Sequence, residues 1–278
     1  MKLFLSVLTL FWVVMGCNDT AENLPSEEAK EQSRQLFETA FHTDKRHPLQ
    51  GSRTAMNLLD SILNLDTTNA AAWREKSVPY LKRGLPYEWK PLFDKAVQYH
   101  PEVWQPWRGY LYLMFYRDYE KAIADFNASD TLTPQIDYPQ GHSVDYWRGI
   151  AYLGLKDFKN SIAYFNKHIK KETEDTGEDW VELEAFLYRG IAYYEIGNCR
   201  EAITNFDKIK QHFISSAEGK YYWAKCLFHL GKTDEALSML NEAESDYKNQ
   251  LCLDHDYVEM PYQIYLTDIT DLKSSLLP

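Results

Sequence analysis

The sequence predicts an all-α protein in which about six helical hairpins stack into a solenoid and a further helix closes the C-terminal end. Two observations lead to this prediction. Apolar residues recur at a helical period in pairs of short segments, and one signature of small and aromatic residues repeats along most of the chain. The 278 residues, 45% of them hydrophobic, supply enough apolar material for a continuous core, and strand signals are few.

The clearest hairpin runs from Phe186 to Ile209. The break between its two helices falls at Gly197 and Asn198, two residue types that tolerate the positive φ found at a helix end. We expect the two helices to approach closely at the small residues Gly190 and Ala202. The apolar positions at helical spacing are Leu187, Ile191 and Tyr194 in the first half, and Ala202, Ile203, Phe206 and Ile209 in the second.

The same signature, Gly-x-x-Tyr followed by aromatic-x-x-Ala-x-x-x-Phe, recurs in four other units. Its members are Trp73, Tyr80, Gly84, Phe93, Ala96 and Pro101; Gly109, Tyr112, Tyr119, Ala122, Phe126 and Pro134; Gly149, Tyr152, Phe158, Ser161 and Phe165; and Leu227, Gly231, Ala236, Leu240 and Ala243. These residues resemble the tetratricopeptide repeat (TPR), a helical hairpin of 34 residues with Trp, Leu, Gly, Tyr, Ala, Phe, Ala and Pro at set offsets. The sequence departs from the pattern at Trp89, which replaces a small Ala, and near Gly109, where the first helix is shifted by about one residue.

The elements follow in chain order. The first hairpin is predicted over residues 27–42 and 52–65, with Ser26 as its N-cap. The second unit covers 70–101, the third extends to Pro134, and the sixth covers 217–246. Insertions at 133–142 and 170–182 interrupt the spacing of 34 residues. Such insertions form loops, either on a binding face or as solvated connections between repeats.

The tail from Tyr257 to Leu277 is predicted to be a helix, with Pro261 near its first turn. The resemblance to TPR proteins implies that this helix covers the last hairpin. An amphipathic membrane helix is the alternative, but the segment has a single cation, Lys273, where such helices carry a basic face. Its apolar stripe consists of Val258, Tyr262, Tyr265, Ile269, Leu272 and Leu276.

The N-terminus predicts a signal peptide over residues 1–16. The apolar run from Leu3 to Val14 is shorter than the roughly 20 residues that a spanning helix needs. The run ends in Val14-Met15-Gly16-Cys17, which resembles a bacterial lipobox. The resemblance implies that Cys17 is diacylated and becomes the mature N-terminus. An ordinary secretory signal with a chance Cys17 is the alternative.

The residue after Cys17 is Asn18 and not Asp, which favours the outer over the inner membrane as the site of a lipoprotein. The polar, acidic stretch that follows has too few apolar residues to form a core. We therefore expect a tether over residues 17–33, a solenoid over 34–250 and a capping region over 251–278.

The charge and the motifs exclude several classes of function. A formal net charge of −11 argues against a nucleic-acid partner. We expect no enzyme activity, no cofactor and no metal site: the segment from Cys252 to Asp256 lacks the paired spacing of metal ligands, and residues 172–179 lack the ligand pattern of a calcium loop. Cys199 and Cys226 are either buried free thiols or a disulfide formed in an oxidising periplasm.

In TPR arrays the first helices line a concave surface, so the resemblance implies a groove for a partner. The repeat register assigns to this groove Arg74, Lys82, Arg108, Tyr112, Tyr146, Ile150, Ile191, Tyr194, Tyr221 and Lys225. The lining is aromatic and aliphatic, which suits a helix or an extended apolar peptide. Some TPR proteins clamp a terminal carboxylate with Lys and Asn, but the positions of the clamp Asn are occupied here by Val78, Ile150, Ile191 and Lys225.

Two functions compete. The first is a non-catalytic scaffold, tethered to the membrane at Cys17, that holds another envelope protein in its groove; this layout is similar to TPR lipoproteins that help assemble outer-membrane barrels or pilus secretins. The second is a small-ligand or glycan-binding protein that stacks its ligand on aromatic residues, although most of these lie at core spacing. An enzyme formed by the two insertions is a third possibility. The tryptophans concerned are Trp73, Trp89, Trp104, Trp107, Trp147, Trp180 and Trp223.

Overall fold

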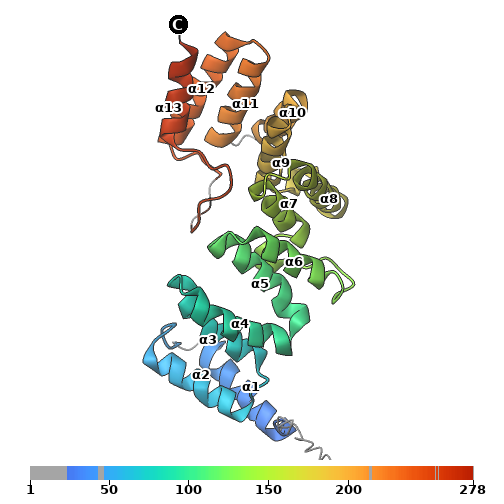
Figure 1. Cartoon of the computed structure of the whole chain (residues 1–278), viewed down its shortest axis with the longest axis vertical. Helices are drawn as coiled ribbons and strands as arrows, with labels where there is room; N and C mark the ends of the chain where they lie inside the picture. The colour runs from blue at the N-terminus through green and yellow to red at the C-terminus, as the bar shows by residue number, and fades with distance from the viewer. Residues whose placement is uncertain (1–23, 43–46, 213–214, 254, 256, 278) are drawn as a thin grey trace, which may run out of the picture.

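The computed structural model describes residues 24–42, 47–212, 215–253, 255 and 257–277, and within these ranges every regular element is a helix (Figure 1). The predicted signal peptide, lipobox and Cys17 lie outside the described residues. Six hairpins follow one another, each formed by an odd-numbered helix and the next even-numbered one, and α13 lies beside α12 at the end of the array. The predicted all-α solenoid with a C-terminal capping helix is therefore confirmed.

The helices agree with the predicted repeats in number and position. Their bounds are α1 Glu27–Phe41, α2 Arg53–Leu65, α3 Ala70–Lys82, α4 Pro86–Tyr99, α5 Pro101–Tyr116, α6 Tyr119–Ser129, α7 Val144–Gly154, α8 Phe158–Thr176, α9 Leu183–Glu195, α10 Cys199–Gln211, α11 Ala217–His229, α12 Thr233–Lys248 and α13 Leu266–Leu276. Two short 3₁₀ turns, η1 Pro139–Gly141 and η2 Glu178–Trp180, lie in the insertions.

Local capping explains where several helices begin and end. The Ser26 side chain accepts a hydrogen bond from the Ala29 amide, as an N-cap does. Asn198 caps α10 in the same way, and Gly197 before it has the positive φ of +78° that was predicted. The array begins ahead of the predicted boundary at residue 34, because Ser33 in α1 is fully buried and donates to the Ile62 carbonyl.

The small residues of the signature admit an aromatic ring from the second helix of the same hairpin. A Cβ atom added at Gly190 would lie 2.5 Å from Cε1 of Phe206. The same relation holds for Gly109 with Phe126 and for Gly149 with Phe165, at 2.7 Å and 2.9 Å. The close approach expected at Gly190 is therefore made by the Phe206 ring, which explains why glycine and phenylalanine recur together.

Trp89 fits the core although the pattern calls for a small residue at its position. Its side chain is 1% exposed, and its ring packs against Phe93 and, edge to face, against Tyr112. The indole also packs against Tyr116, with ring centres 5.0 Å apart. It is thus accommodated between α4 and α5 of the next repeat.

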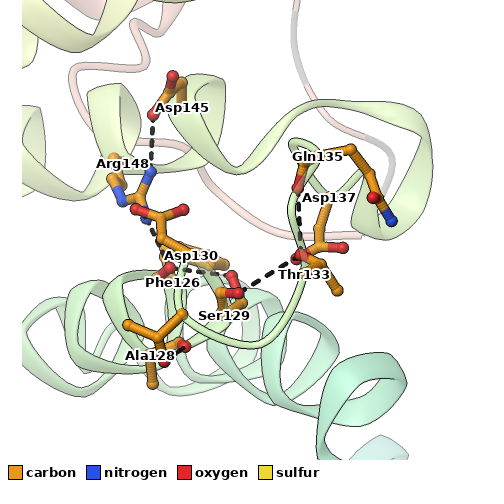
Figure 2. Close-up of polar contacts among 10 residues, drawn as sticks. Phe126, Ala128, Ser129, Asp130, Thr133, Gln135, Asp137, Asp145 and Arg148 are labelled. Atoms are coloured by element: carbon orange, nitrogen blue, oxygen red, sulfur yellow. Dashed lines mark hydrogen bonds and ion pairs between the residues drawn. The ribbon is translucent and has the colours of Figure 1, made fainter.

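The insertion at 133–142 is a folded connection that is tied to both neighbouring repeats (Figure 2). The Thr133 hydroxyl lies 3.0 Å from a carboxylate oxygen of Asp137, and the Val144 amide donates to the Asp137 carbonyl. Beside it, the buried guanidinium of Arg148 donates to Asp145, to Asp130 and to the Phe126 carbonyl, at 2.6, 2.6 and 2.5 Å. Repeats three and four are therefore joined by a buried polar network.

The insertion at 170–182 is mostly helical, which corrects the expectation of a loop. Helix α8 continues to Thr176 and ends at Gly177, whose φ is +99°. A short 3₁₀ turn then leads to Glu182, the N-cap of α9. The extra residues thus lengthen the second helix of the fourth repeat by more than one turn.

The C-terminal helix is shorter than predicted. Helix α13 begins at Leu266, and Pro261 lies in a turn before it, where the Gln263 amide donates to the Met260 carbonyl. Tyr262 has a φ of +64°, which a helix does not tolerate. Helix α13 packs on α12 through the buried Ile269, as the capping role requires. Within the part of the chain that the structure describes, no helix combines the length and the apolar character needed to cross a bilayer.

Candidate functional site

The concave surface has an open half near the N-terminus. A pocket of about 700 Å³ lies between α3 and α5, and we call it the open pocket. The residues that line it are Arg74, Val78, Leu81, Lys82, Gly84, Phe93, Trp107, Tyr110, Leu111, Phe115, Gln140 and Tyr257. Its size is that of a site for a short peptide segment or a drug-sized ligand.

The open pocket combines an apolar wall with two cations. The Arg74 guanidinium pairs with Glu75 at 2.7 Å and lies 5.7 Å from the centre of the Trp104 ring. The Lys82 side chain is exposed at the rim. Two of the ten predicted groove residues, Arg74 and Lys82, therefore belong to this pocket.

The third repeat contributes different residues from those predicted. Arg108 points between α4, α5 and α6, where it pairs with Asp94 and Asp125, both at 2.7 Å. Burial opposes its charge, but the two carboxylates outweigh burial and raise the pKa of Arg108 above its ordinary value. Tyr112 is buried against Trp89. Arg108 and Tyr112 are thus packing residues, and the register prediction for this repeat was wrong.

The residues of α5 that line the pocket are Trp107, Tyr110, Leu111 and Phe115. Trp107, Leu111 and Phe115 are four residues apart, which is the spacing of one helix face, and Trp107 and Leu111 lie one residue before the predicted Arg108 and Tyr112. This difference agrees with the shift of about one residue that the sequence shows near Gly109.

The other half of the concave surface is covered by the chain itself. Residues 251–253, 255 and 257–265, which we call the strap, lie between α12 and α13 and extend toward α5 (Figure 1). The Tyr222 hydroxyl donates to the Tyr262 carbonyl at 3.0 Å, and Arg117 at the end of α5 pairs with Glu259 at 2.8 Å. The strap therefore spans repeats three to six.

Three predicted groove residues of repeats four and five lie beside or below the strap. Tyr146 lines a cavity of about 190 Å³ together with Leu253 and Met260 of the strap. Ile191 lines a smaller cavity, also with Met260. Ile150 is fully buried in the core and has no surface to offer a ligand.

The last three predicted residues form one cluster. The Lys225 ammonium lies 4.6 Å from the ring centre of Tyr194 and 5.4 Å from that of Tyr221, and the Tyr222 ring is 5.0 Å away. Burial lowers the pKa of Lys225 and raises that of Tyr194 to about 12. The cluster thus places a half-buried cation among three aromatic rings.

A buried polar network, which the sequence did not reveal, joins the two insertions. His142 Nδ1 and His168 Nε2 lie 3.0 and 2.9 Å from the two carboxylate oxygens of Glu182. The other nitrogen of His168 is 2.9 Å from the Ser143 hydroxyl, which also accepts the Tyr146 amide as an N-cap. Burial raises the pKa of Glu182, but the two histidine hydrogen bonds outweigh it and hold the pKa well below its usual range.

Ser143, His168 and Glu182 have the residue types of a nucleophilic triad, but their arrangement serves the structure of the protein. Ser143 and His168 are each 1% exposed, so a substrate has no path to the hydroxyl. The hydroxyl also serves α7 as its cap. Among the described residues, no three His, Cys, Asp or Glu side chains are arranged to hold a metal ion.

Two cysteines and two tryptophans lie in the core. Cys199 and Cys226 are buried free thiols, and burial raises the pKa of Cys226. Trp89 and Trp147 are also buried, whereas Trp107 lines the open pocket and Trp180 is 78% exposed. These four tryptophans therefore do not share one surface on which a sugar could stack.

Comparison with known proteins agrees with this architecture. A family model described as the tetratricopeptide repeat matches residues 184–213 and 218–249. No curated protein matches the chain.

Similar solved structures include PilW, a widely conserved type IV pilus biogenesis factor, with a TM-score of 0.57, 15% identity and coverage of 80% of this chain and 95% of that chain. PilF of Pseudomonas aeruginosa has a TM-score of 0.56 at 15% identity, over 89% and 98% of the two chains. YrrB, a TPR protein with an unusual peptide-binding site, has a TM-score of 0.53 at 15% identity, over 69% and 94%. At this level of identity the likeness is one of fold, and the shared fold is a solenoid of helical hairpins.

Proposed function

We propose that this tetratricopeptide-repeat protein is a non-catalytic scaffold of the bacterial cell envelope, tethered by a lipid at Cys17, that binds a segment of a partner protein in the open pocket. The observation that carries the proposal is the division of the concave surface. The strap covers the half near the C-terminus, whereas the open pocket retains about 700 Å³. A binding surface of the repeat array is thus available between α3 and α5.

The lining of the open pocket indicates the chemistry of the partner. Trp107, Leu111 and Phe115 offer an apolar wall, and Lys82 offers a cation at the rim. A peptide with two or three large apolar side chains on one face would pack against this wall, and a carboxylate beside them would pair with Lys82. Anchoring by large apolar groups in a pocket is the usual source of binding energy in such interfaces.

The envelope location rests on the lipobox resemblance around Cys17 and is supported by the fold likeness to PilW, a pilus biogenesis factor. The binding of a peptide segment is supported by the likeness to YrrB, whose peptide-binding site is described as unusual. Two acyl chains at one cysteine hold a protein to a membrane far better than one does, since each buried CH₂ contributes about 0.8 kcal/mol.

The test is site-specific crosslinking in the native bacterium. A photoreactive residue replaces Phe115, which lines the open pocket and is 38% exposed. The matched control places the same residue at Glu120, an exposed position on α6 of the same repeat. Both variants are also made with Cys17→Ser.

We expect one dominant envelope protein to crosslink from position 115 and not from position 120. The yield should fall when Cys17→Ser releases the protein from the membrane. The proposal is wrong if position 115 captures no protein, or if positions 115 and 120 capture the same set in equal yield.

A further inference from the structure

The strap lies on the concave surface through its apolar side chains. Met260 and Ile264 are buried, and Val258 and Tyr262 are partly buried against the same core. The backbone turns between them, because the Gln263 amide donates to the Met260 carbonyl at 3.2 Å and Tyr262 has a φ of +64°. Tyr257 at one end of this stretch is 83% exposed. Apolar side chains on both sides of a tight turn therefore pack against the helices.

The helices also recognise the strap backbone. The Tyr222 hydroxyl donates to the Tyr262 carbonyl at 3.0 Å, and the Leu253 amide donates to the Glu218 carboxylate at 3.1 Å. The strap thus occupies its half of the groove with the contacts of a ligand.

One charged contact fastens the strap at the edge of the open pocket. Arg117 donates to the Glu259 carboxylate at 2.8 Å and to the Glu259 carbonyl at 3.2 Å. The two side chains are 54% and 46% exposed, so the pair is weak and is screened by salt. This pair is therefore a solvent-exposed contact, unlike the buried Met260 and Ile264 of the strap.

We propose that the strap is a resident ligand of the concave surface, and that a partner segment of the same chemistry binds there by exchange with it. The segment carries apolar or aromatic side chains on both sides of a tight turn and a carboxylate between the first two of them. Val258, Glu259, Met260, Tyr262 and Ile264 supply this pattern in the chain itself. The proposal goes beyond the open pocket, because it concerns the half of the groove that the strap covers.

The probe is a fluorescent synthetic peptide with the sequence of residues 257–265, measured by fluorescence anisotropy against the full chain. The release variant combines Glu259→Gln, Met260→Ser and Ile264→Ser, which weaken the strap and leave Arg117 and the helices unchanged. We expect the peptide to bind the release variant about tenfold or more tightly than the wild type, since the strap no longer competes. A peptide with the same three substitutions should bind neither protein.

Arg117→Gln in the release variant should weaken peptide binding severalfold, because the carboxylate of the peptide loses its partner. Arg200→Gln, at an exposed position on α10, is the matched control and should have no effect. Equal affinity of the peptide for the wild type and the release variant would overturn the proposal.

Hydrogen exchange on the wild type tests the proposal without any substitution. We expect the amides of 258–265 to exchange much faster than those of α9, and faster still in high salt, because the strap opens while the repeats stay folded. If the amides of the strap and of α9 exchange their hydrogens in one cooperative step, the strap does not open separately, and its displacement by a ligand is refuted. Tyr257 at one end of the strap lines the open pocket together with Phe115. The anisotropy assay uses the peptide alone and the crosslinking uses the native partner, so each proposal can fail while the other stands.

Discussion

Glu182→Gln tests whether the buried network holds the two insertions together. The substitution keeps the shape of the side chain and removes its charge. Glu182 is 25% exposed and accepts from His142 and from His168, whose side chain has no exposed surface. His142 in turn stacks on Tyr146, with ring centres 4.6 Å apart. The network therefore links the segment between α8 and α9 to Tyr146 on α7.

The expected cost follows from the two hydrogen bonds. A hydrogen bond to a charged group contributes about 1.5–3 kcal/mol, against about 1 kcal/mol for a neutral one. Replacing two charged bonds, at 3.0 and 2.9 Å, by neutral ones should therefore lower the free energy of unfolding by about 2 kcal/mol at pH 7. Some of this is recovered if the histidine tautomers adapt to the amide.

The pH dependence has a definite sign. The folded pKa of Glu182 is depressed, so its contribution is fully present above the unfolded value of about 4.3 and is lost as the pH falls below it. We expect the stability gap between wild type and Glu182→Gln to narrow as the pH falls below about 4. Urea unfolding followed by circular dichroism measures both proteins across this range. Glu184→Gln, two residues away on α9, is the control and should stay within about 0.5 kcal/mol of the wild type.

Equal stability of Glu182→Gln and wild type at pH 7 would show that the network is not a stabilising connection. A gap that stays constant below pH 4 would show that the charge of Glu182 is not its source.

Three further predictions concern the core and use the same unfolding assay. Gly190→Ala should destabilise the protein by about 1–2 kcal/mol, because the new methyl group meets a phenylalanine ring at 2.5 Å, whereas Gly219→Ala, with its nearest atom at 3.4 Å, should be neutral or stabilising; equal effects would contradict the packing argument. Trp89→Ala should lower the free energy of unfolding by about 3–5 kcal/mol, although alanine is the residue of the repeat pattern. Trp180→Ala, at a position 78% exposed, should change it little. A stabilised Trp89→Ala would show that the repeat pattern outweighs the local packing. Arg148→Met should lower the free energy of unfolding by about 3 kcal/mol or more, because the Phe126 carbonyl and the Asp145 carboxylate lose their cation. A decrease below about 1 kcal/mol would show that the junction of repeats three and four does not depend on Arg148.

The fold was predictable because its determinants are local. Helix periods, caps and the Gly197 turn act between residues three or four apart, and the repeat shows them several times. The pairing of small and aromatic residues within each hairpin was also visible, although only the structure showed that the phenylalanine ring, and not Ala202, fills the space at Gly190. The sequence by itself therefore determined the helices, their order and the existence of a concave surface.

The site depended on the tertiary structure. Arg117 and Glu259 are 142 residues apart, and His142 and Glu182 are 40 apart, so no periodic pattern links them. The sequence showed a helical stripe through Tyr262, Tyr265 and Ile269, but the chain before Leu266 is not helical. Packing against α9 and α11, the positive φ of Tyr262 and the hydrogen bond from the Gln263 amide to the Met260 carbonyl favour a turn there instead. Only these long-range contacts determine which half of the groove stays open. A local sequence pattern does not fix where the C-terminal segment packs on the repeats.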